Sequence, residues 1–369
     1  MVAKMLHGDA VKQYNPQDEV CGTVTSGGTE SIFNGVYIHR EWAREEKNIY
    51  QPEMVVPVTI HPAFHKAAHY LGIKMISVPI NGDFEADVDA MQAQITPNTI
   101  AIAGSAGNYP YGIIDPLEKL SNIALEYKIG LHVDGCLGGF ILPWIERSGY
   151  DIPPFDFRLP GVTTMSCDTH KYGYALKGTS CLLVRNHKLL RYQFFSVSDW
   201  PGGIYCSPTV QGSRSGGLSA ATWAAMVSLG EEGYLNAAKL IMDTANKIRH
   251  GISEIPEIKI AGKSIFVIGM LSDQVDMYHV NDYLISKGWR MNGCQNPHGF
   301  HFCITLHNTL PGVAESFIKD LRDGVAYAKD PPQPFPKSGA LYGLAGTVDG
   351  QGFLKQSMLD FIEATYDEV

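Results

Sequence analysis

The sequence lacks three features that would place it in a specialised class: paired cysteines, a long apolar run and a secretory signal at its start. The cysteines are odd in number and scattered, without a Cys-x-x-Cys pair, so we expect neither a metal site nor a disulfide framework. This pattern fits a reducing compartment, and we expect a soluble, cytoplasmic chain; a membrane anchor upstream of residue 1 stays open. The seven cysteines are Cys21, Cys136, Cys167, Cys181, Cys206, Cys294 and Cys303.

Basic stretches are also lacking. The chain has 29 Lys and Arg against 38 Asp and Glu, which gives a formal net charge of -9. Nucleic-acid-binding proteins usually gather Lys and Arg into a patch or stripe, so we expect no nucleic-acid partner. The densest charged segment, Arg40–Lys47, mixes both signs and is typical of the solvated face of a helix.

Over its first two thirds, the sequence alternates short apolar runs with helical patterns. Such runs, with few charges, are typical of strands that are buried on both faces. Their alternation with helices predicts an α/β domain around a mostly parallel sheet. The expected strands are Met54–Ile60, Lys74–Ile80, Thr99–Ser105, Gly130–Asp134, Thr163–Cys167 and Ser180–Val184. The expected helices are Glu30–Glu46, Pro62–Leu71, Asp87–Gln94 and Leu117–Tyr127.

A long helical pattern, Ser219–Arg249, connects this region to a smaller C-terminal part. Mixed strand and helix patterns there predict an α+β domain, and the Pro-rich segment Asp330–Lys337 is expected to be a loop. We therefore expect an N-terminal remnant (1–20), a large domain (21–245) and a small domain (246–369). The expected elements of the small domain are the strands Ser264–Leu271 and His301–Thr305 and the helices Val275–Lys287 and Val313–Lys329.

Two glycines, Gly27 and Gly28, stand between hydroxyl residues just before an amphipathic helix. Glycine lets the backbone approach a ligand closely, and the start of a helix offers unpaired N–H groups that favour a phosphate. Ser26 and Thr29 add hydroxyl donors. The pattern indicates a phosphate-binding loop, and the alternative is a simple Ser/Thr helix cap after a glycine turn.

Two charged residues stand at or after the carboxyl ends of expected strands. Open parallel sheets bind ligands at this edge. Asp134 can face a pyridinium nitrogen and keep it protonated, or it can cap a local turn. Lys171 can form a Schiff base if burial and a nearby cofactor lower its pKa, or it can be an ordinary surface lysine.

A histidine after another expected strand completes the pattern. His61 can stack on the face of a flat cofactor, or it can pack at the start of its own helix. A phosphate loop, a strand-end aspartate and a strand-end lysine, in this order, suit pyridoxal 5'-phosphate (PLP). We therefore expect a PLP-dependent enzyme.

The residues now resemble a known family, the sphingosine-1-phosphate lyases. The PLP elements are shared with glutamate and aromatic amino-acid decarboxylases, whereas the longer segments, above all around Trp200–Tyr205, are more specific to the lyases. The resemblance runs from Cys21 to Asn308 and weakens toward the C-terminus. The segments that carry it are CGTVTSGGTES, HVDGCLGGF, CDTHKYGYALKGTS, YQFFSVSDWPGGIYCSPTVQGSRSGG and GFHFCITLHN.

The resemblance implies a fold type I PLP enzyme, similar in architecture to aspartate aminotransferase, with a mostly parallel seven-stranded sheet. Lys171 matches the Schiff-base lysine, Asp134 the carboxylate at the pyridine nitrogen, and His61 the stacking histidine. The matched phosphate contacts are Gly28, Thr29 and His170, together with Gly212 and Ser213, which reach the cofactor of the partner subunit. The matched substrate-side residues are Lys177 and Tyr109. From the residues around them, Gly27 and Cys136 are further candidate cofactor contacts, and Cys136 either touches the ring or merely packs.

The activity that the resemblance implies is retro-aldol cleavage of the C2–C3 bond of a phosphorylated long-chain base. The products are a fatty aldehyde and phosphoethanolamine, and the alternative function is PLP-dependent amino-acid decarboxylation. The general base stays open among Lys177, Lys171, Tyr109 and the cofactor phosphate. Family members are homodimers with shared active sites. They also carry a longer N-terminal region, with a membrane span in eukaryotes, so membrane association here depends on such a segment or on the lipid substrate.

Overall fold

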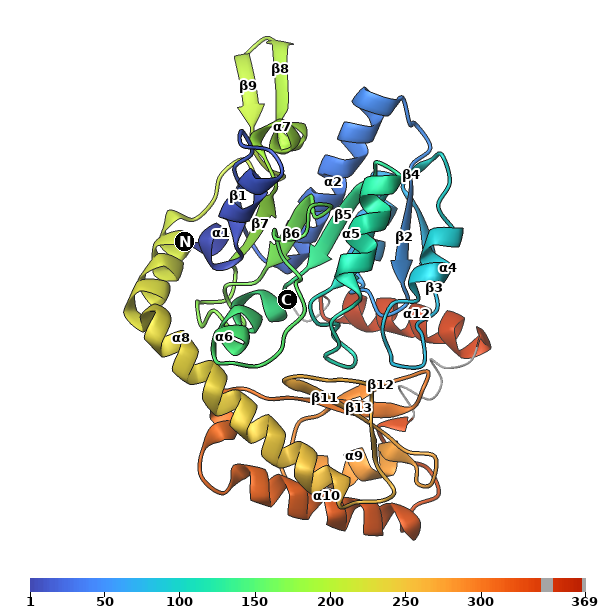
Figure 1. The fold of residues 1–369 in the computed structure, drawn as a ribbon. Helices are drawn as coiled ribbons and strands as arrows, with labels where there is room; N and C mark the ends of the chain where they lie inside the picture. The colour runs from blue at the N-terminus through green and yellow to red at the C-terminus, as the bar shows by residue number, and fades with distance from the viewer. Residues whose placement is uncertain (340–347, 367–369) are drawn as a thin grey trace. The chain divides into compact units, whose positions relative to one another are not determined.

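The computed structural model describes residues 1–339 and 348–366 (Figure 1). Contacts between residues divide the chain into two compact units. The larger consists of Met1–Tyr109 and Ile113–Lys239, and the smaller of Pro110–Gly112 and Leu240–Val369. The domain bounds at residues 20 and 245 stay a prediction.

The larger unit is built on a seven-stranded sheet with the order β1-β7-β6-β5-β4-β2-β3. Strand β7 runs antiparallel to its neighbours β1 and β6, and the remaining pairs are parallel. The expected mostly parallel seven-stranded sheet is therefore confirmed. The strands are β1 (Cys21–Thr25), β2 (Glu53–Pro57), β3 (Lys74–Val78), β4 (Thr99–Ser105), β5 (Gly130–Asp134), β6 (Thr164–Cys167) and β7 (Ser180–Val184).

Helices α2 and α3 pack against each other and, with β2 and β4, enclose an apolar core that includes Ile32, Val56, Phe64 and Ala101. Burial of such side chains is the main force that holds a sheet and its helices together. The helices of this unit are α1 (Val2–Met5), α2 (Gly28–Lys47), α3 (Ala63–Leu71), α4 (Val88–Ala93), α5 (Leu117–Glu126), α6 (Leu142–Arg147) and α7 (His187–Leu190). Short 3-10 turns lie at η1 (Gly8–Gln13), η2 (Gly138–Phe140) and η3 (Arg191–Gln193).

A two-stranded hairpin, β8 (Phe195–Trp200) with β9 (Gly203–Ser207), projects from this unit (Figure 1). Nearly all of its residues are exposed, including Trp200 at 57% and Ile204 at 84%. This hairpin is not predicted from the sequence, because its strands lack a buried face and therefore a clear alternation of apolar and polar residues.

The long helix α8 (Gly216–Ser253) contains the boundary between the two units. It covers the expected helix Ser219–Arg249, but its backbone leaves the helical conformation at Gly230, where φ is 60°. Glycine is the residue that adopts such a positive φ without strain, which explains why a break occurs there.

The smaller unit has a four-stranded antiparallel sheet with the order β10-β11-β13-β12, and helices α9 and α10 pack against each other. Its α+β character agrees with the expectation from the sequence. The strands are β10 (Lys259–Ile260), β11 (Val267–Leu271), β12 (Asn292–Cys294) and β13 (Gly299–Cys303). The helices are α9 (Met277–Ser286), α10 (Val313–Lys329) and α12 (Val348–Ala364), with a 3-10 turn at η4 (Leu306–Thr309).

Within the described residues, no helix is both long enough and apolar enough to cross a membrane. The same part of the chain contains no group of three or more His, Cys, Asp or Glu side chains that could hold a metal ion.

Candidate active site

Four neighbouring strands of the large sheet lead to residues that the sequence analysis selected. In the order β6-β5-β4-β2, Lys171 follows β6, Asp134 ends β5, Tyr109 follows β4 and His61 follows β2. These strands are parallel, so their carboxyl ends lie at one edge of the sheet. Open α/β sheets bind ligands at this edge, and the candidate active site lies there.

The Asp134 carboxylate is buried and held by two donors. Its Oδ1 accepts hydrogen bonds from the backbone N–H of Cys136 at 3.0 Å and from the Ser166 hydroxyl on β6 at 3.2 Å. The Nε2 atom of His132 lies 3.2 Å from the same hydroxyl. Burial, reinforced by the neighbouring His39, lowers the pKa of His132 to about 3, so this imidazole is neutral. Asp134 therefore has a fixed orientation at the end of β5.

Lys171 forms an ion pair with a carboxylate that lies three residues earlier, in the same strand-end segment. Its Nζ atom is 3.0 Å from Oδ2 of Asp168, and its side chain is 32% exposed. Burial alone lowers the pKa of Lys171, but Cys136 and Asp168 outweigh it and raise that pKa above the ordinary lysine value. The pKa of Lys171 is therefore raised in the protein without its cofactor, and a lowering of this pKa by burial together with the bound cofactor stays a prediction.

The start of α2 closes the site from the side of β1. Gly27 precedes the helix with a φ of 156°, and a side chain on Gly28 would place its Cβ 2.8 Å from the Asp168 carboxylate oxygens and 2.9 Å from Cys136 Sγ. Only glycine fits at position 28 without displacing these groups. Thr29 is exposed, and no side chain caps the first turn of the helix. The first N–H groups of α2 are therefore available to a ligand.

His170 and Cys136 are two further residues that the sequence predicts at the cofactor. His170 Nδ1 lies 2.5 Å from the carbonyl oxygen of Thr179; because a carbonyl only accepts, this nitrogen carries a hydrogen. Cys136 is buried and belongs to the apolar core of α2 and α3. Burial raises the pKa of its thiol well above the ordinary value, which agrees with a packing role.

His61 and Tyr109 form a second pair at the same edge of the sheet. Their rings meet edge to face with centroids 6.4 Å apart, and Tyr109 is 44% exposed. His61 Nδ1 also accepts a hydrogen bond from the backbone N–H of Ala63 at 3.1 Å. The hydrogen bond to Ala63 shows that the ring orders the start of α3, and stacking of His61 on a cofactor stays a prediction.

Three predicted site residues lie outside this cluster. Lys177 is exposed and makes no hydrogen bond or ion pair with any residue in the described ranges. Gly212 and Ser213 are exposed in the segment that leads from the hairpin to α8. No hydrogen bond or ion pair links any of these three residues to Asp134 or Lys171 in the part of the chain that the structure describes.

Two residues of the site, Asp168 and Ser166, were not selected from the sequence. Asp168 stands in the quoted segment CDTHKYGYALKGTS, so its spacing of three residues from Lys171 was a visible signal. Ser166 carried no such signal, because only the pairing of β5 with β6 brings it to Asp134.

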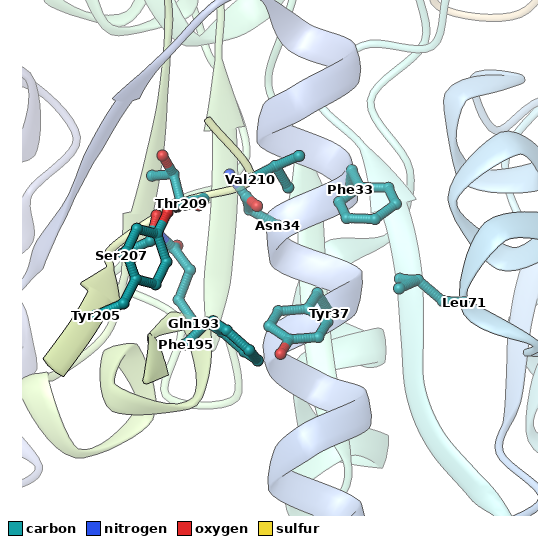
Figure 2. A pocket seen from close by; sticks show the side chains of 10 residues that line it. All are labelled: Phe33, Asn34, Tyr37, Leu71, Gln193, Phe195, Tyr205, Ser207, Thr209 and Val210. Atoms are coloured by element: carbon teal, nitrogen blue, oxygen red, sulfur yellow. Dashed lines mark hydrogen bonds between the residues drawn. The ribbon is translucent and has the colours of Figure 1, made fainter. Parts of the chain in front are cut away.

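A separate pocket of about 400 Å³ lies between α2 and the base of the hairpin (Figure 2). Asn34 at its wall is 1% exposed, and neither amide atom has a hydrogen-bond partner among the described residues. Figure 2 shows this side chain extending from α2 toward Thr209 and Val210. The lining residues are Phe33, Asn34, Tyr37, Leu71, Gln193, Phe195, Tyr205, Ser207, Thr209 and Val210. None of the predicted site residues is among them.

The residues at the sheet edge fit PLP. A strand-end carboxylate suits the pyridine nitrogen, a lysine amine suits the aldehyde, and an uncapped helix start suits the phosphate. One observation points to a missing polar partner at this place: Asp168 Oδ1 is buried without a hydrogen-bond partner among the described residues. Fold and site together define a PLP-dependent enzyme of fold type I.

The chain belongs to the pyridoxal-dependent decarboxylase family, whose conserved domain matches residues 1–268. PLP is accordingly its cofactor. A sphingosine-1-phosphate lyase structure from Burkholderia pseudomallei is similar, with a TM-score of 0.88 and 50% identity, and the match covers 89% of this chain and 75% of that one. A glutamate decarboxylase from Lactobacillus brevis, with a TM-score of 0.75 and 22% identity, shows the shared fold.

Curated relatives of the chain carry the same name as the Burkholderia protein. The sphingosine-1-phosphate lyase of Oryza sativa is 45% identical over 96% of this chain, and that of Arabidopsis thaliana is 46% identical over 94% of it. The chain spans 66% of the rice protein and 64% of the Arabidopsis protein.

Proposed function

We propose that this chain is the catalytic part of a sphingosine-1-phosphate lyase that acts in sphingolipid metabolism. In this role it is an aldehyde-lyase of the sphinganine-1-phosphate aldolase type, which splits a phosphorylated long-chain base into a long-chain aldehyde and phosphoethanolamine. The observation that carries the proposal is the 50% identity with the Burkholderia lyase over 89% of this chain. The residues at the sheet edge support it, because they fit the cofactor that this reaction needs.

PLP, when bound, draws electrons from a bond at the amine-bearing carbon of the substrate. Asp134, oriented by Ser166 and the Cys136 N–H, keeps a proton on the pyridine nitrogen. The His61 ring would stack on the face of the bound cofactor. The N–H groups at the start of α2, from Gly28 and Thr29, bind the phosphate together with His170.

On the substrate side, Lys171 supplies the amine that holds the cofactor, and Tyr109 lines the substrate pocket. Cleavage of the C2–C3 bond requires that a base within hydrogen-bond reach take the proton of the C3 hydroxyl. Lys177, Lys171 and Tyr109 are the candidates on this chain. Lys177, which is exposed and has no ion pair in the described residues, can instead bind the substrate phosphate as a point charge.

The proposed form of the enzyme is a cytoplasmic homodimer with shared active sites. Two observations support a dimer: the hairpin exposes Trp200 and Ile204, and the exposed Gly212 and Ser213 have no contact with the cofactor site of their own subunit. Large apolar side chains gathered on a surface are typical of an interface. We assign Gly212 and Ser213 to the cofactor phosphate of the partner subunit. The cytoplasmic location depends on the cysteine pattern, which fits a reducing compartment.

The decisive experiment is to incubate the PLP-loaded chain with sphingosine 1-phosphate and to measure a long-chain aldehyde and phosphoethanolamine. We expect both products in equal amounts, and neither with Lys171→Ala. Release of CO2 from amino acids, without aldehyde from the phosphorylated base, would instead identify an amino-acid decarboxylase. If the loaded chain releases neither set of products, the proposal fails for this chain.

A further inference from the structure

We propose that Asp168 is a positioning residue of this site, whose buried carboxylate holds the Lys171 amine in place and keeps it charged until the cofactor attaches. The inference rests on the proposed function, because Lys171 is the cofactor lysine there.

The geometry of Asp168 carries the proposal. The residue directly follows β6 and is 3% exposed, and its Oδ2 lies 3.0 Å from Lys171 Nζ. Its other oxygen, Oδ1, has no hydrogen-bond partner among the described residues. Burial of a carboxylate is unfavourable unless a cation compensates it, and Lys171 is the nearest cation. The buried Asp168 carboxylate therefore requires the Lys171 amine as its partner, and the ion pair holds this amine at a fixed place.

The close approach of Gly28 shows that this carboxylate faces the phosphate loop. A Cβ at position 28 would lie 2.8 Å from both Asp168 oxygens, so the start of α2 lies directly beside them. His170 Nε2 is farther away, at 3.8 Å from Oδ2, which is too long for a hydrogen bond. Asp168 thus stands between the cofactor lysine and the groups that we assign to the cofactor phosphate.

The other titratable groups around Asp168 do not replace it as a counter-charge. The thiols of Cys136, Cys167 and Cys181 interact with it electrostatically, and burial raises the pKa of all three, so they stay protonated at neutral pH. Asp134 acts on Lys171 as well, but more weakly than Asp168. At neutral pH, the Asp168 carboxylate is therefore the strongest negative charge acting on the Lys171 amine.

The Asp168 carboxylate affects how readily the Lys171 amine reacts with an aldehyde. Only a neutral amine can attach to an aldehyde, and a nearby carboxylate favours the charged form. Burial opposes this effect and lowers the pKa of Lys171. Removal of the Asp168 charge and hydrogen bond takes away part of what opposes burial, so the amine should become neutral at a lower pH. A purely structural role for Asp168 predicts no such shift.

The test measures the rate at which PLP attaches to the full chain, followed by absorbance across a range of pH. For Asp168→Asn, we expect the pH midpoint of this rate to fall by about one unit, the size of shift typical of a lost neighbouring charge. The matched control is Asp156→Asn, which removes another buried carboxylate of the larger unit, paired with His7 and Arg158. This control should keep the midpoint of the natural chain.

A midpoint that does not move in Asp168→Asn would overturn the proposal. If that variant does not fold, the pKa of Lys171 can be measured by an NMR titration of the cofactor-free natural chain with 13C-labelled lysines. The Lys171 signal is assigned by its loss in Lys171→Ala. A Lys171 pKa above the ordinary lysine value of 10.5 supports the proposal, and a value below it overturns it. If PLP does not attach to the natural chain, the proposed function fails separately.

Discussion

The sheet edge and the pocket beside α2 both bury polar side chains, but they differ in how those side chains are paired. At the sheet edge, Asp134 accepts two hydrogen bonds and Lys171 pairs with Asp168. In the pocket, both amide atoms of Asn34 and the Gln193 oxygen lack partners among the described residues. A buried charge without compensation is far less favourable than a buried neutral amide, so charges must be paired where amides can go unpaired.

The paired groups make the sheet edge a site that is organised for chemistry. The pocket beside α2 has no such organisation. Each charged group at the sheet edge is held by a hydrogen-bond or ion-pair partner, so single substitutions there should affect binding and catalysis together. In the pocket, the Asn34 amide holds no group in place among the described residues, so its substitution should affect stability alone. The predictions below test this contrast, beginning with the largest expected effect.

Lys171→Ala should have the largest effect. Without the amine, PLP cannot attach covalently, and turnover should fall by roughly 10⁴-fold or more, as for other enzymes that lose the residue making the covalent bond. The variant also leaves the Asp168 carboxylate without its ion-pair partner. Absorbance of the attached cofactor and aldehyde release measure the two losses. Retention of either in Lys171→Ala would show that this lysine does not hold the cofactor.

Asp134→Ala should have the next largest effect. Loss of the carboxylate removes the charge that we assign to the pyridine nitrogen, and one preorganised electrostatic group is typically worth about 100-fold to 1000-fold in kcat. We also expect weaker PLP binding, measured by titration of the cofactor-free protein. A rate near that of the natural chain would mean that Asp134 serves only to order the turn at Cys136.

How far the sequence predicted this site depends on the kind of information that each part needed. Strands β4, β5 and β7 begin and end at the predicted residues, because short apolar runs buried on both faces have a clear composition. Strand β1 was not predicted, because Cys21–Thr25 is a partly exposed edge strand with mixed polarity. Strand-end residues could be selected because the sheet edge is a general binding position.

The electrostatic balance at Lys171 could not be predicted in the same way. The sequence shows one lysine with aspartates near and far, but only the fold decides which carboxylate lies 3.0 Å away. The spacing of three residues marks Asp168 and Lys171 as a possible pair, but in a strand-end segment with no regular periodicity it does not fix the contact. The same limit applies to Ser166 and Asp134, which meet only because β5 and β6 are neighbours.

Gly28→Ala should have an intermediate effect. The added Cβ would lie 2.8 Å from the Asp168 carboxylate, so the loop or the carboxylate must move. Such overpacking typically costs about 1–3 kcal/mol of unfolding free energy, and the shifted loop should also weaken PLP binding. Denaturant unfolding and cofactor titration measure the two effects. The control is Gly82→Ala, because a Cβ at Gly82 meets nothing within 4 Å. Equal PLP affinity in both variants would contradict the close approach at Gly28.

Asn34→Leu should have the smallest effect, and of the opposite sign. The substitution removes two unpaired buried amide atoms and adds an apolar group beside a pocket of about 400 Å³, so we expect the unfolding free energy to rise by about 1 kcal/mol with activity unchanged. Gln193→Leu is the matched control, because Gln193 Nε2 donates to the Pro208 carbonyl at 2.6 Å. Loss of this hydrogen bond in Gln193→Leu should lower the unfolding free energy by about 1 kcal/mol. If Asn34→Leu is instead the destabilising variant of the two, the Asn34 amide is paired in solution, and the contrast between the two regions does not hold.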